Sequence, residues 1–295
     1  MRCNLCPRRC GVDREVSLGA CGVGDKIRVA KIMHHEWEEP PISGTRFSGA
    51  IFFSGCNLGC VYCQNAPISH ECYGEEMSEE ALAEAMLKLQ SEGAHNINLV
   101  TPTHYSDKIR GAIDKIRDRL KIPVVYNTSG YELPEQIAKM SGYVDIFLTD
   151  MKYFSAEASK KYSRASDYFE HALASVKEML KISPECVFDS EGIMKKGVII
   201  RHLVLPSLRA DSIKILETLN SEIDISKIRL SLMSQYTPDF CPDKIKELKR
   251  KITTFEYQSV LDRANALGYE GYIQEKSSAS VVYTPEFKKG NKNEA

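Results

Sequence analysis

Residues 50–63 read AIFFSGCNLGCVYC, and this stretch decides the fold of the 295-residue chain. It joins a short apolar segment, residues 50–54, directly to three closely spaced cysteines. An apolar strand that runs into a functional loop is the repeating unit of parallel α/β folds, whose sites lie at the carboxyl ends of the strands. The stretch therefore predicts a strand of a buried parallel sheet, with the chemistry of the protein at its end.

The rest of the chain repeats this pattern. Apolar, strand-like segments recur at residues 97–101, 123–128, 144–151, 198–205 and 228–235. Amphipathic helical segments are predicted between and after them, at residues 78–93, 106–120, 133–140, 168–181, 212–220, 243–251 and 254–267. Strands that alternate with helices indicate an α/β fold, and periodicity alone fits both an open doubly wound sheet and a full or partial barrel.

Composition and charge exclude several classes of protein. The chain is 43% hydrophobic and 27% charged with a net charge of −1, which does not suggest a nucleic-acid-binding surface. Its longest apolar runs are far shorter than the ~20 residues of a membrane span, and the first residues lack the apolar core of a signal peptide. We therefore expect a cytoplasmic protein with neither membrane nor nucleic-acid partners.

The ten cysteines are concentrated near the start of the chain. Nothing points to an oxidising compartment, so metal binding is a better interpretation of the clusters than disulfides. Cys56, Cys60 and Cys63 have the spacing Cys-x3-Cys-x2-Cys, and three thiolates on one loop can bind three irons of a [4Fe–4S] cube. The fourth iron is then open to a ligand. The alternatives are a zinc site, which needs a fourth ligand such as Cys72 or His70, or three cysteines that bind nothing.

This motif, with an aromatic residue before the third cysteine and Gln64-Asn65 after it, resembles the signature of the radical S-adenosylmethionine (SAM) superfamily. The flanking residues are similar to the branch of pyruvate formate-lyase activating enzymes and their uncharacterised relatives. The likeness spans nearly the whole chain and includes residues 38–44 (EEPPISG), 52–56 (FFSGC), 149–152 (TDMK) and 233–236 (MSQY).

The resemblance implies a partial TIM-type (β/α)6 barrel and a [4Fe–4S] cluster on Cys56, Cys60 and Cys63. It also implies that SAM binds the open iron and is cleaved reductively to a 5′-deoxyadenosyl radical that abstracts hydrogen, an oxidoreductase or lyase chemistry. An external reductant such as flavodoxin or ferredoxin supplies the electron in such a system. The acceptor implied is a glycine in a glycyl-radical partner protein; the alternatives are a small metabolite, or peptide or cofactor maturation. A non-catalytic zinc or iron–sulfur scaffold or electron carrier is the alternative outside enzymes.

The polar residues at other strand ends are the candidates for binding SAM. They are Tyr62 in the motif, Thr101 and Thr103 with His104 after the second strand, Asn127 and Ser129 after the third, Asp150 and Lys152 after the fourth, and Arg201 inside the fifth. Asp150 and Lys152 are two apart and should face the same side of a strand. Arg201 in an apolar strand must be paired or contact a ligand, while its neighbour His202 should point the opposite way.

Two departures separate the chain from the activating enzymes. The Gly-Gly-Glu-like stretch of that family is replaced by Thr101-Pro102-Thr103-His104, and Gln235-Tyr236 stands where the family carries a Tyr-His pair. Both argue against carrying over the activating enzymes' detailed mechanism. Cys241 follows at a position that can approach a substrate.

Cys3, Cys6, Cys10 and Cys21 form a second set, in a segment too poor in apolar residues to fold without help. Four thiolates suit zinc or a closed [4Fe–4S] cluster equally well, and many relatives carry such a set. We divide the chain into a cysteine-rich metal-binding segment (1–47), the barrel (48–285) and a flexible tail (286–295).

Overall fold

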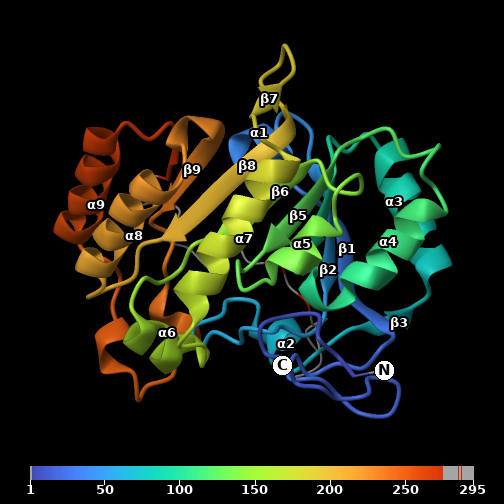
Figure 1. The fold of residues 1–295 in the computed structure, drawn as a ribbon, viewed down its shortest axis with the longest axis horizontal. Helices are drawn as coiled ribbons and strands as arrows, with labels where there is room; N and C mark the ends of the chain where they lie inside the picture. The colour runs from blue at the N-terminus through green and yellow to red at the C-terminus, as the bar shows by residue number, and fades with distance from the viewer. Residues whose placement is uncertain (1, 275–284, 286, 288–295) are drawn as a thin grey trace, which may run out of the picture.

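The computed structural model describes residues 2–274, 285 and 287 (Figure 1). The fold is α/β and is built on one curved sheet with the strand order β10-β9-β8-β6-β5-β4-β2-β1-β3, to which β7 is attached through β8. The strands are β1 (Ile27–His35), β2 (Ser48–Phe53), β3 (Glu75–Met77), β4 (Ile97–Val100), β5 (Val124–Thr128), β6 (Ile146–Asp150), β7 (Val187–Phe188), β8 (Met194–Leu203), β9 (Ile228–Met233) and β10 (Gly271–Ile273).

The sheet is mostly parallel. Each neighbouring pair from β2 to β10 along the main path is parallel, whereas β1 is antiparallel to β2 and β3 is antiparallel to β1. The six strands expected from sequence are β2, β4, β5, β6, β8 and β9. Their order in the sheet follows their order in the chain, as in a partial barrel, with β10 and β3 at its two edges.

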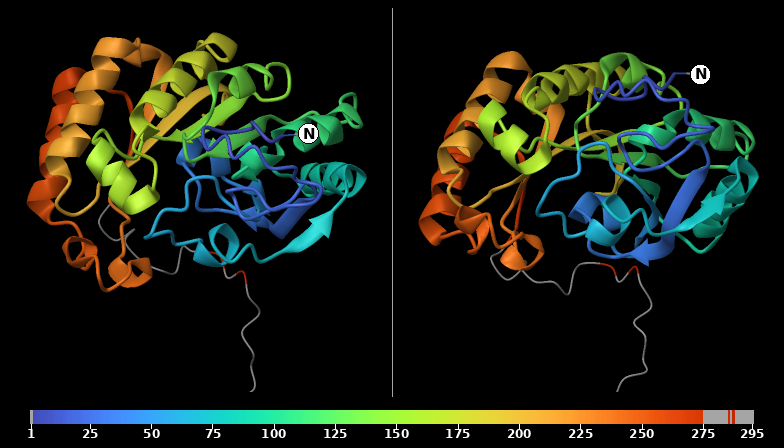
Figure 2. Two further views of the ribbon diagram at one scale, coloured as in Figure 1. Left: turned by 60° about the horizontal axis from the view of Figure 1, so that its bottom comes forward. Right: turned by 90° about the horizontal axis from the view of Figure 1, so that it is seen from below.

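The longer helices follow one another along the outer side of this curved sheet (Figure 2). The α-helices are α1 (Pro40–Ser43), α2 (Ala66–Ser69), α3 (Glu79–Ser91), α4 (Ser106–Asp114), α5 (Pro134–Ala138), α6 (Ala156–Ser163), α7 (Tyr168–Ile182), α8 (Arg209–Glu222) and α9 (Thr254–Leu267). Apolar side chains from the sheet and from α3, α4 and α7 share one continuous core. No helix of the described residues is both long and apolar enough to cross a membrane.

Local signals explain where several helices begin. The Ser78 hydroxyl accepts a hydrogen bond from the Ala81 N–H at the start of α3, and α9 begins with a reciprocal capping pair of Thr253 and Glu256. The helix predicted at residues 106–120 begins at Ser106 as expected, but α4 already ends at Asp114.

Two stretches differ from the secondary structure predicted above. Residues 27–35 were assigned to the cysteine-rich segment and not to a strand, but they form β1, whose mixed burial gives a weaker pattern than a central strand. The helix predicted at residues 243–251 is only a short 3-10 turn, Lys246–Leu248. Ile245 and Leu248 are both buried there, so their spacing of three residues had imitated a helical face. The predicted tail lies outside the described residues except for Phe287.

Candidate functional site

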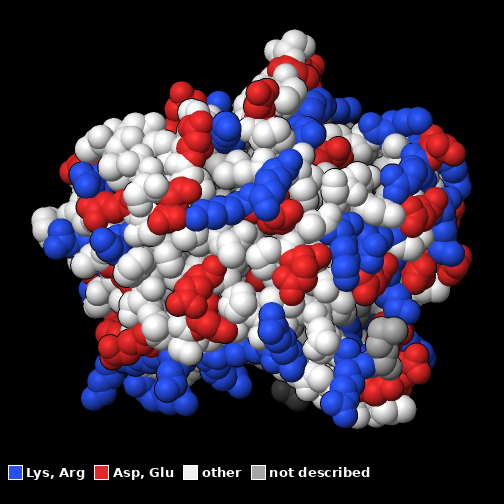
Figure 3. All heavy atoms as spheres, viewed as in Figure 1, with Lys and Arg blue, Asp and Glu red and all other residues white. Residues whose placement is uncertain are grey.

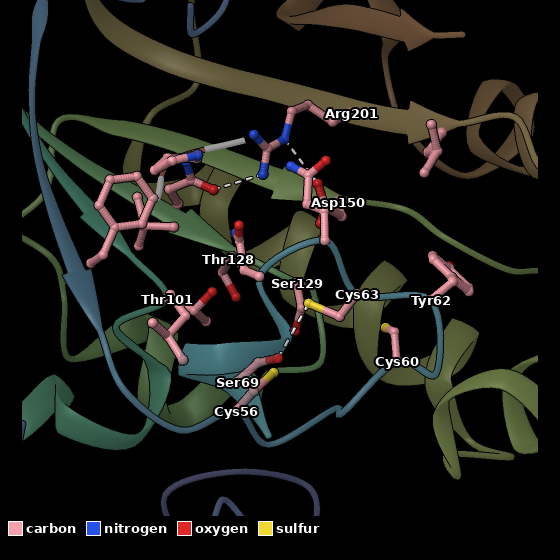
Figure 4. A pocket seen from close by; sticks show the side chains of 18 of the residues that line it. Cys56, Cys60, Tyr62, Cys63, Ser69, Thr101, Thr128, Ser129, Asp150 and Arg201 are labelled. Carbon is pink, nitrogen blue, oxygen red and sulfur yellow. Dashed lines mark hydrogen bonds and ion pairs between the residues drawn. The ribbon is translucent and has the colours of Figure 1, made fainter. Parts of the chain in front are cut away.

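A cavity of about 240 Å³ lies at the carboxyl ends of the parallel strands. It gathers ten residues that the sequence had singled out from separate segments: Cys56, Cys60, Tyr62, Cys63, Thr101, Asn127, Ser129, Asp150, Lys152 and Arg201. Figure 4 shows side chains from several strand ends around one space, with the three cysteines on the loop that follows β2. The residues that were selected at separate strand ends therefore line one cavity.

Each of the three cysteine sulfurs in this cavity accepts a hydrogen bond. The donors are the Leu58 N–H to Cys56 Sγ (3.4 Å), the Ser163 hydroxyl to Cys60 Sγ (3.0 Å) and the Ser69 hydroxyl to Cys63 Sγ (3.3 Å). Burial raises the pKa of the Cys56 thiol to about 12 and also raises the pKa of Cys63. Sulfurs that are buried and hydrogen-bonded in this way suit metal-bound thiolates, since a metal replaces the proton and the donors stabilise the negative sulfur.

The backbone of the loop is shaped for close packing. Gly55 has a φ of +88°, and a Cβ there would lie 2.7 Å from the carbonyl oxygen of Cys21.

Among the described residues, no three His, Cys, Asp or Glu side chains converge at the spacing that a single metal ion requires. A cube held through three separate irons does not require such convergence. The three-thiolate donor set fits that group.

A network of charges crosses the cavity. The Arg201 guanidinium donates to Asp150 Oδ1 (2.8 Å), to Asn127 Oδ1 (2.6 Å) and to Glu38 Oε1 (3.1 Å). Lys152 Nζ donates to the other carboxylate oxygen of Asp150 at 2.6 Å. Burial alone would raise the pKa of Asp150, but Arg201 and Lys152 outweigh it and hold that pKa below its usual value. Arg201 is thus paired, which is one of the two outcomes expected for a charge inside an apolar strand.

Two acidic residues from the segment after β1 complete this network. Glu38 Oε2 accepts hydrogen bonds from the Asn98 amide (2.8 Å) and the Asn127 amide (2.9 Å). Its neighbour Glu39 is buried, and burial together with the Glu38 charge raises the pKa of Glu39 to about 8. Sequence reasoning gave neither residue a role. The available signal was the pair of adjacent acids before Pro40-Pro41, but nothing local shows that they enter the barrel.

Tyr62 begins a chain of buried hydrogen bonds that ends on the cysteine loop. Its hydroxyl lies 2.6 Å from the Tyr153 hydroxyl, which lies 2.8 Å from the Ser163 hydroxyl, the donor to Cys60. The Tyr62 ring also meets the Tyr236 ring edge-on at 5.9 Å between centroids. Tyr153 and Ser163 were not among the predicted site residues, since Tyr153 lies 91 residues after Tyr62 and Ser163 lies 103 residues after Cys60.

Three residues lie differently from what the sequence suggested. Thr103 does not line the cavity; its hydroxyl donates to buried Glu132 at 2.5 Å. His104 is neither on a surface loop nor in the cavity, because its Nε2 lies 2.8 Å from the Ser54 carbonyl and burial lowers its pKa to about 4. Cys241 is buried and does not line the cavity. His202 points away as expected, with its Nδ1 against the Met151 carbonyl at 2.7 Å.

The N-terminal cysteine segment packs against the loop of three cysteines. The Cys56 N–H donates to the Cys21 carbonyl at 3.1 Å. The Arg8 guanidinium donates to the carbonyl oxygens of Asn57 (2.7 Å), Leu58 (3.1 Å) and Ser163 (2.9 Å). A Cβ on Gly19 would lie 3.2 Å from Cys21 Sγ and 3.7 Å from Cys10 Sγ, so these two sulfurs border the same small space.

Comparison with known proteins gives one family and one curated relative. The family model of the radical SAM superfamily matches residues 50–190. An uncharacterized protein of Methanocaldococcus jannaschii, MJ0674, is 27% identical over 271 residues, which cover 89% of this chain and 74% of the relative.

Two solved structures share the fold at low sequence identity. SuiB of Streptococcus suis, bound to its precursor peptide SuiA, aligns with a TM-score of 0.50 and 11% identity over 75% of this chain and 46% of SuiB. A radical SAM methyltransferase from Sphaerobacter thermophilus aligns with a TM-score of 0.50 and 10% identity over 77% of this chain and 66% of that enzyme. The chain therefore spans less than two thirds of either protein. The family model thus matches just under half of this chain, and the solved structures show a shared fold.

Proposed function

We propose that this chain is a radical SAM enzyme that holds a [4Fe–4S] cluster on Cys56, Cys60 and Cys63. The observation that carries the proposal is that each of these sulfurs accepts a hydrogen bond beside a cavity lined by polar strand ends. When bound, such a cluster supplies the electron that splits SAM into methionine and a 5′-deoxyadenosyl radical, which takes a hydrogen atom from the substrate.

The residues around the cavity would bind and orient SAM. Lys152 uses one of its three donors on Asp150, which leaves donors for the carboxylate of the methionine moiety. Within the described residues, the buried Ser129 Oγ and Asn65 Oδ1 have no hydrogen-bond partner, and both residues line the cavity. A ribose hydroxyl and the adenine amino group are the kinds of group that would satisfy them. Thr101, Asn127 and the Tyr62 ring complete this proposed SAM site; Thr103 would act only through Glu132.

We also propose a second metal centre at Cys3, Cys6, Cys10 and Cys21, an auxiliary [4Fe–4S] cluster or zinc; zinc would require the four sulfurs to move closer together than they lie in the described residues. Cys10 and Cys21 sulfurs border the space beside Gly19, and the segment has few buried apolar residues to hold it otherwise. Because Cys21 and Arg8 bond directly to the cysteine loop, a metal here would stiffen that loop. Residues 1–47 then act as a cap on the barrel of residues 48–285.

An external reductant such as flavodoxin or ferredoxin would supply the electron, in the cytoplasm where thiols remain reduced. Figure 3 shows basic side chains along the lower left edge of the molecule, beside α6. Lys160 and Lys161 of α6 are exposed, and so are Lys244, Lys246 and Lys249 of the segment that α6 contacts through the Lys161–Glu247 ion pair. A basic rim attracts acidic partners and raises their rate of association.

For the hydrogen donor we propose a protein or peptide. SuiB, which shares the fold, was solved with a precursor peptide, and this motivates the choice. A glycine in a glycyl-radical partner is the specific form implied by the sequence resemblance. A small metabolite, or a peptide in cofactor maturation, is the alternative within the same chemistry.

The test is anaerobic reconstitution followed by metal counting and EPR spectroscopy. The variant C56A/C60A/C63A should lose about four irons per chain and keep any N-terminal metal, while C186S, at a cysteine outside both cysteine groups, should lose none. In the wild type, SAM should change the EPR signal of the reduced cluster. If SAM does not change the EPR signal of the reduced cluster, the result would instead support a non-catalytic scaffold or an electron carrier.

A further inference from the structure

A second cavity, of about 120 Å³, adjoins the first. The two share Trp37, Glu38, Arg201, Met233 and Gln235 in their lining. The second cavity alone is lined by Glu39 and Pro40, by Ser231 of β9, and by Tyr272, Ile273 and Gln274 at the edge strand β10. It therefore lies where the segment after β1 meets the β10 edge of the sheet, next to the proposed SAM site.

In the part of the chain that the structure describes, three carboxylates near this cavity face two cations, Arg201 and Lys152. Arg201 bonds to both Glu38 and Asp150, and Lys152 bonds to Asp150. Within the described residues, Arg201 and Lys152 balance Glu38 and Asp150, and no cation pairs with Glu39. Glu39 is 7% exposed, and its Oε2 has no hydrogen bond within the described part of the chain. A buried acceptor without a partner is costly unless a ligand supplies one.

An aromatic ring lies beside these carboxylates. Trp37 is the only tryptophan of the chain and is 65% exposed, although it lines both cavities. Tryptophan is the best of the aromatic rings at holding an organic cation over its face. An exposed indole next to an unbalanced carboxylate is a combination that recognises ammonium and guanidinium groups.

We propose that the second cavity binds a singly charged organic cation, an ammonium or guanidinium group carried by the substrate. The group would donate a hydrogen bond to Glu39 Oε2, balance the third carboxylate and pack against the Trp37 ring. The volume of the second cavity admits a short alkylammonium chain. The neighbouring first cavity would hold the reacting part of the substrate near SAM. The inference rests on the proposed function only for the identity of the ligand as substrate; the binding itself needs neither SAM nor reduction.

The state of Glu39 adds a pH dependence to this binding. The groups that act on it are Glu38, Arg201, His35 and Tyr272. Burial and Glu38 raise the pKa of Glu39 to about 8, so a cation that binds at neutral pH must displace a proton. Affinity should fall by roughly tenfold per pH unit below that pKa, and binding should release close to one proton.

The test is titration of the reconstituted full chain with n-butylammonium, followed by Trp37 fluorescence and by proton release in weak buffer. We expect a saturable change with n-butylammonium and none with 1-pentanol, its neutral counterpart of similar size, or with equal concentrations of NaCl. E39Q should weaken binding on the order of tenfold or more, whereas E36Q, an exposed acid two residues away from Glu38, should leave it unchanged.

If E39Q does not fold, W37L provides a second test. This variant lacks the indole ring and should bind n-butylammonium more weakly, which calorimetry measures because no tryptophan remains to fluoresce. Proton release on binding is measured on the wild type and needs no variant. Tighter binding of the tripeptide Gly-Lys-Gly than of n-butylammonium would assign the cation to a peptide; equal affinity would assign it to a small amine. Equal binding of 1-pentanol, or cation binding without proton release, would overturn the proposal. None of these measurements depends on SAM cleavage, so this proposal and the proposed enzyme activity can fail separately.

Discussion

The Ser163 hydroxyl donates a hydrogen bond to Cys60 Sγ over 3.0 Å, which ties the end of α6 to the cysteine loop 103 residues earlier. Tyr153 and Tyr62 hold that serine from the other side. Hydrogen bonds to cysteine sulfur are one of the ways in which a protein sets the potential of an iron–sulfur cluster. This contact is therefore a sensitive point at which to test the account.

S163A should keep the cluster but make it harder to reduce, because the added electron increases the negative charge that the hydroxyl stabilises. Loss of a bond worth about 1 kcal/mol corresponds to a shift on the order of 40 mV toward negative potential. A redox titration followed by EPR measures it. S159A is the control, since Ser159 is equally buried on α6 but donates to a backbone carbonyl. Equal potentials in S163A and S159A would contradict the role given to this bond.

R8A should loosen the cysteine loop. Arg8 bonds to the carbonyls of Asn57, Leu58 and Ser163, and bonds to a charged donor are worth about 1.5–3 kcal/mol each before relaxation. We expect a lower melting temperature and faster loss of iron to a chelator. R9A should change neither, because Arg9 is exposed and its contact to Glu135 is 4.0 Å long. Equal rates of iron loss from R8A and R9A would mean that Arg8 does not hold the cysteine loop in place.

R201M should destabilise the fold by about 3–5 kcal/mol, because it leaves Asp150 and Glu38 as buried charges without their shared partner. R201K should recover part of the lost stability. A lysine ammonium should not reproduce the geometry in which the planar guanidinium donates to Asp150, Asn127 and Glu38. Urea denaturation measures the stability, and equilibrium dialysis measures SAM binding. R229K is the control, an arginine of β9 whose partner Glu270 is exposed. A stable R201M protein would show that the network is dispensable.

E39Q should change how stability depends on pH. The pKa of Glu39 is raised from 4.5 to about 8 in the folded chain, so its proton stabilises the fold at low pH. That stabilisation is complete below about 4.5 and is lost as the pH rises toward 8. The free energy of unfolding of E39Q minus that of the wild type should therefore increase with pH in this window, by at most about 1.4 kcal/mol per unit. Urea denaturation at several pH values checks the slope; a flat difference would mean that Glu39 titrates normally.

The sequence predicted much of the fold because central parallel strands are apolar on both faces. Such a strand can be recognised from its own residues, without knowing which strands lie beside it. The sequence also predicted that Arg201 is either paired or in contact with a ligand, because a charge inside an apolar strand is otherwise costly. Glu38 and Glu39 escaped prediction because their partners lie up to 163 positions away and their own segment resembles a surface loop. Ser163 escaped for the same reason. The false helix at residues 243–251 came from apolar spacing that a 3-10 turn satisfies equally well.

The most direct test of the central claim is the formation of 5′-deoxyadenosine. The reconstituted chain is incubated anaerobically with dithionite and SAM, and the products are separated by chromatography. We expect 5′-deoxyadenosine and methionine in equal amounts from the wild type, and neither from C56A/C60A/C63A. A wild-type chain with four irons in a reduced cluster that forms no 5′-deoxyadenosine would contradict this claim.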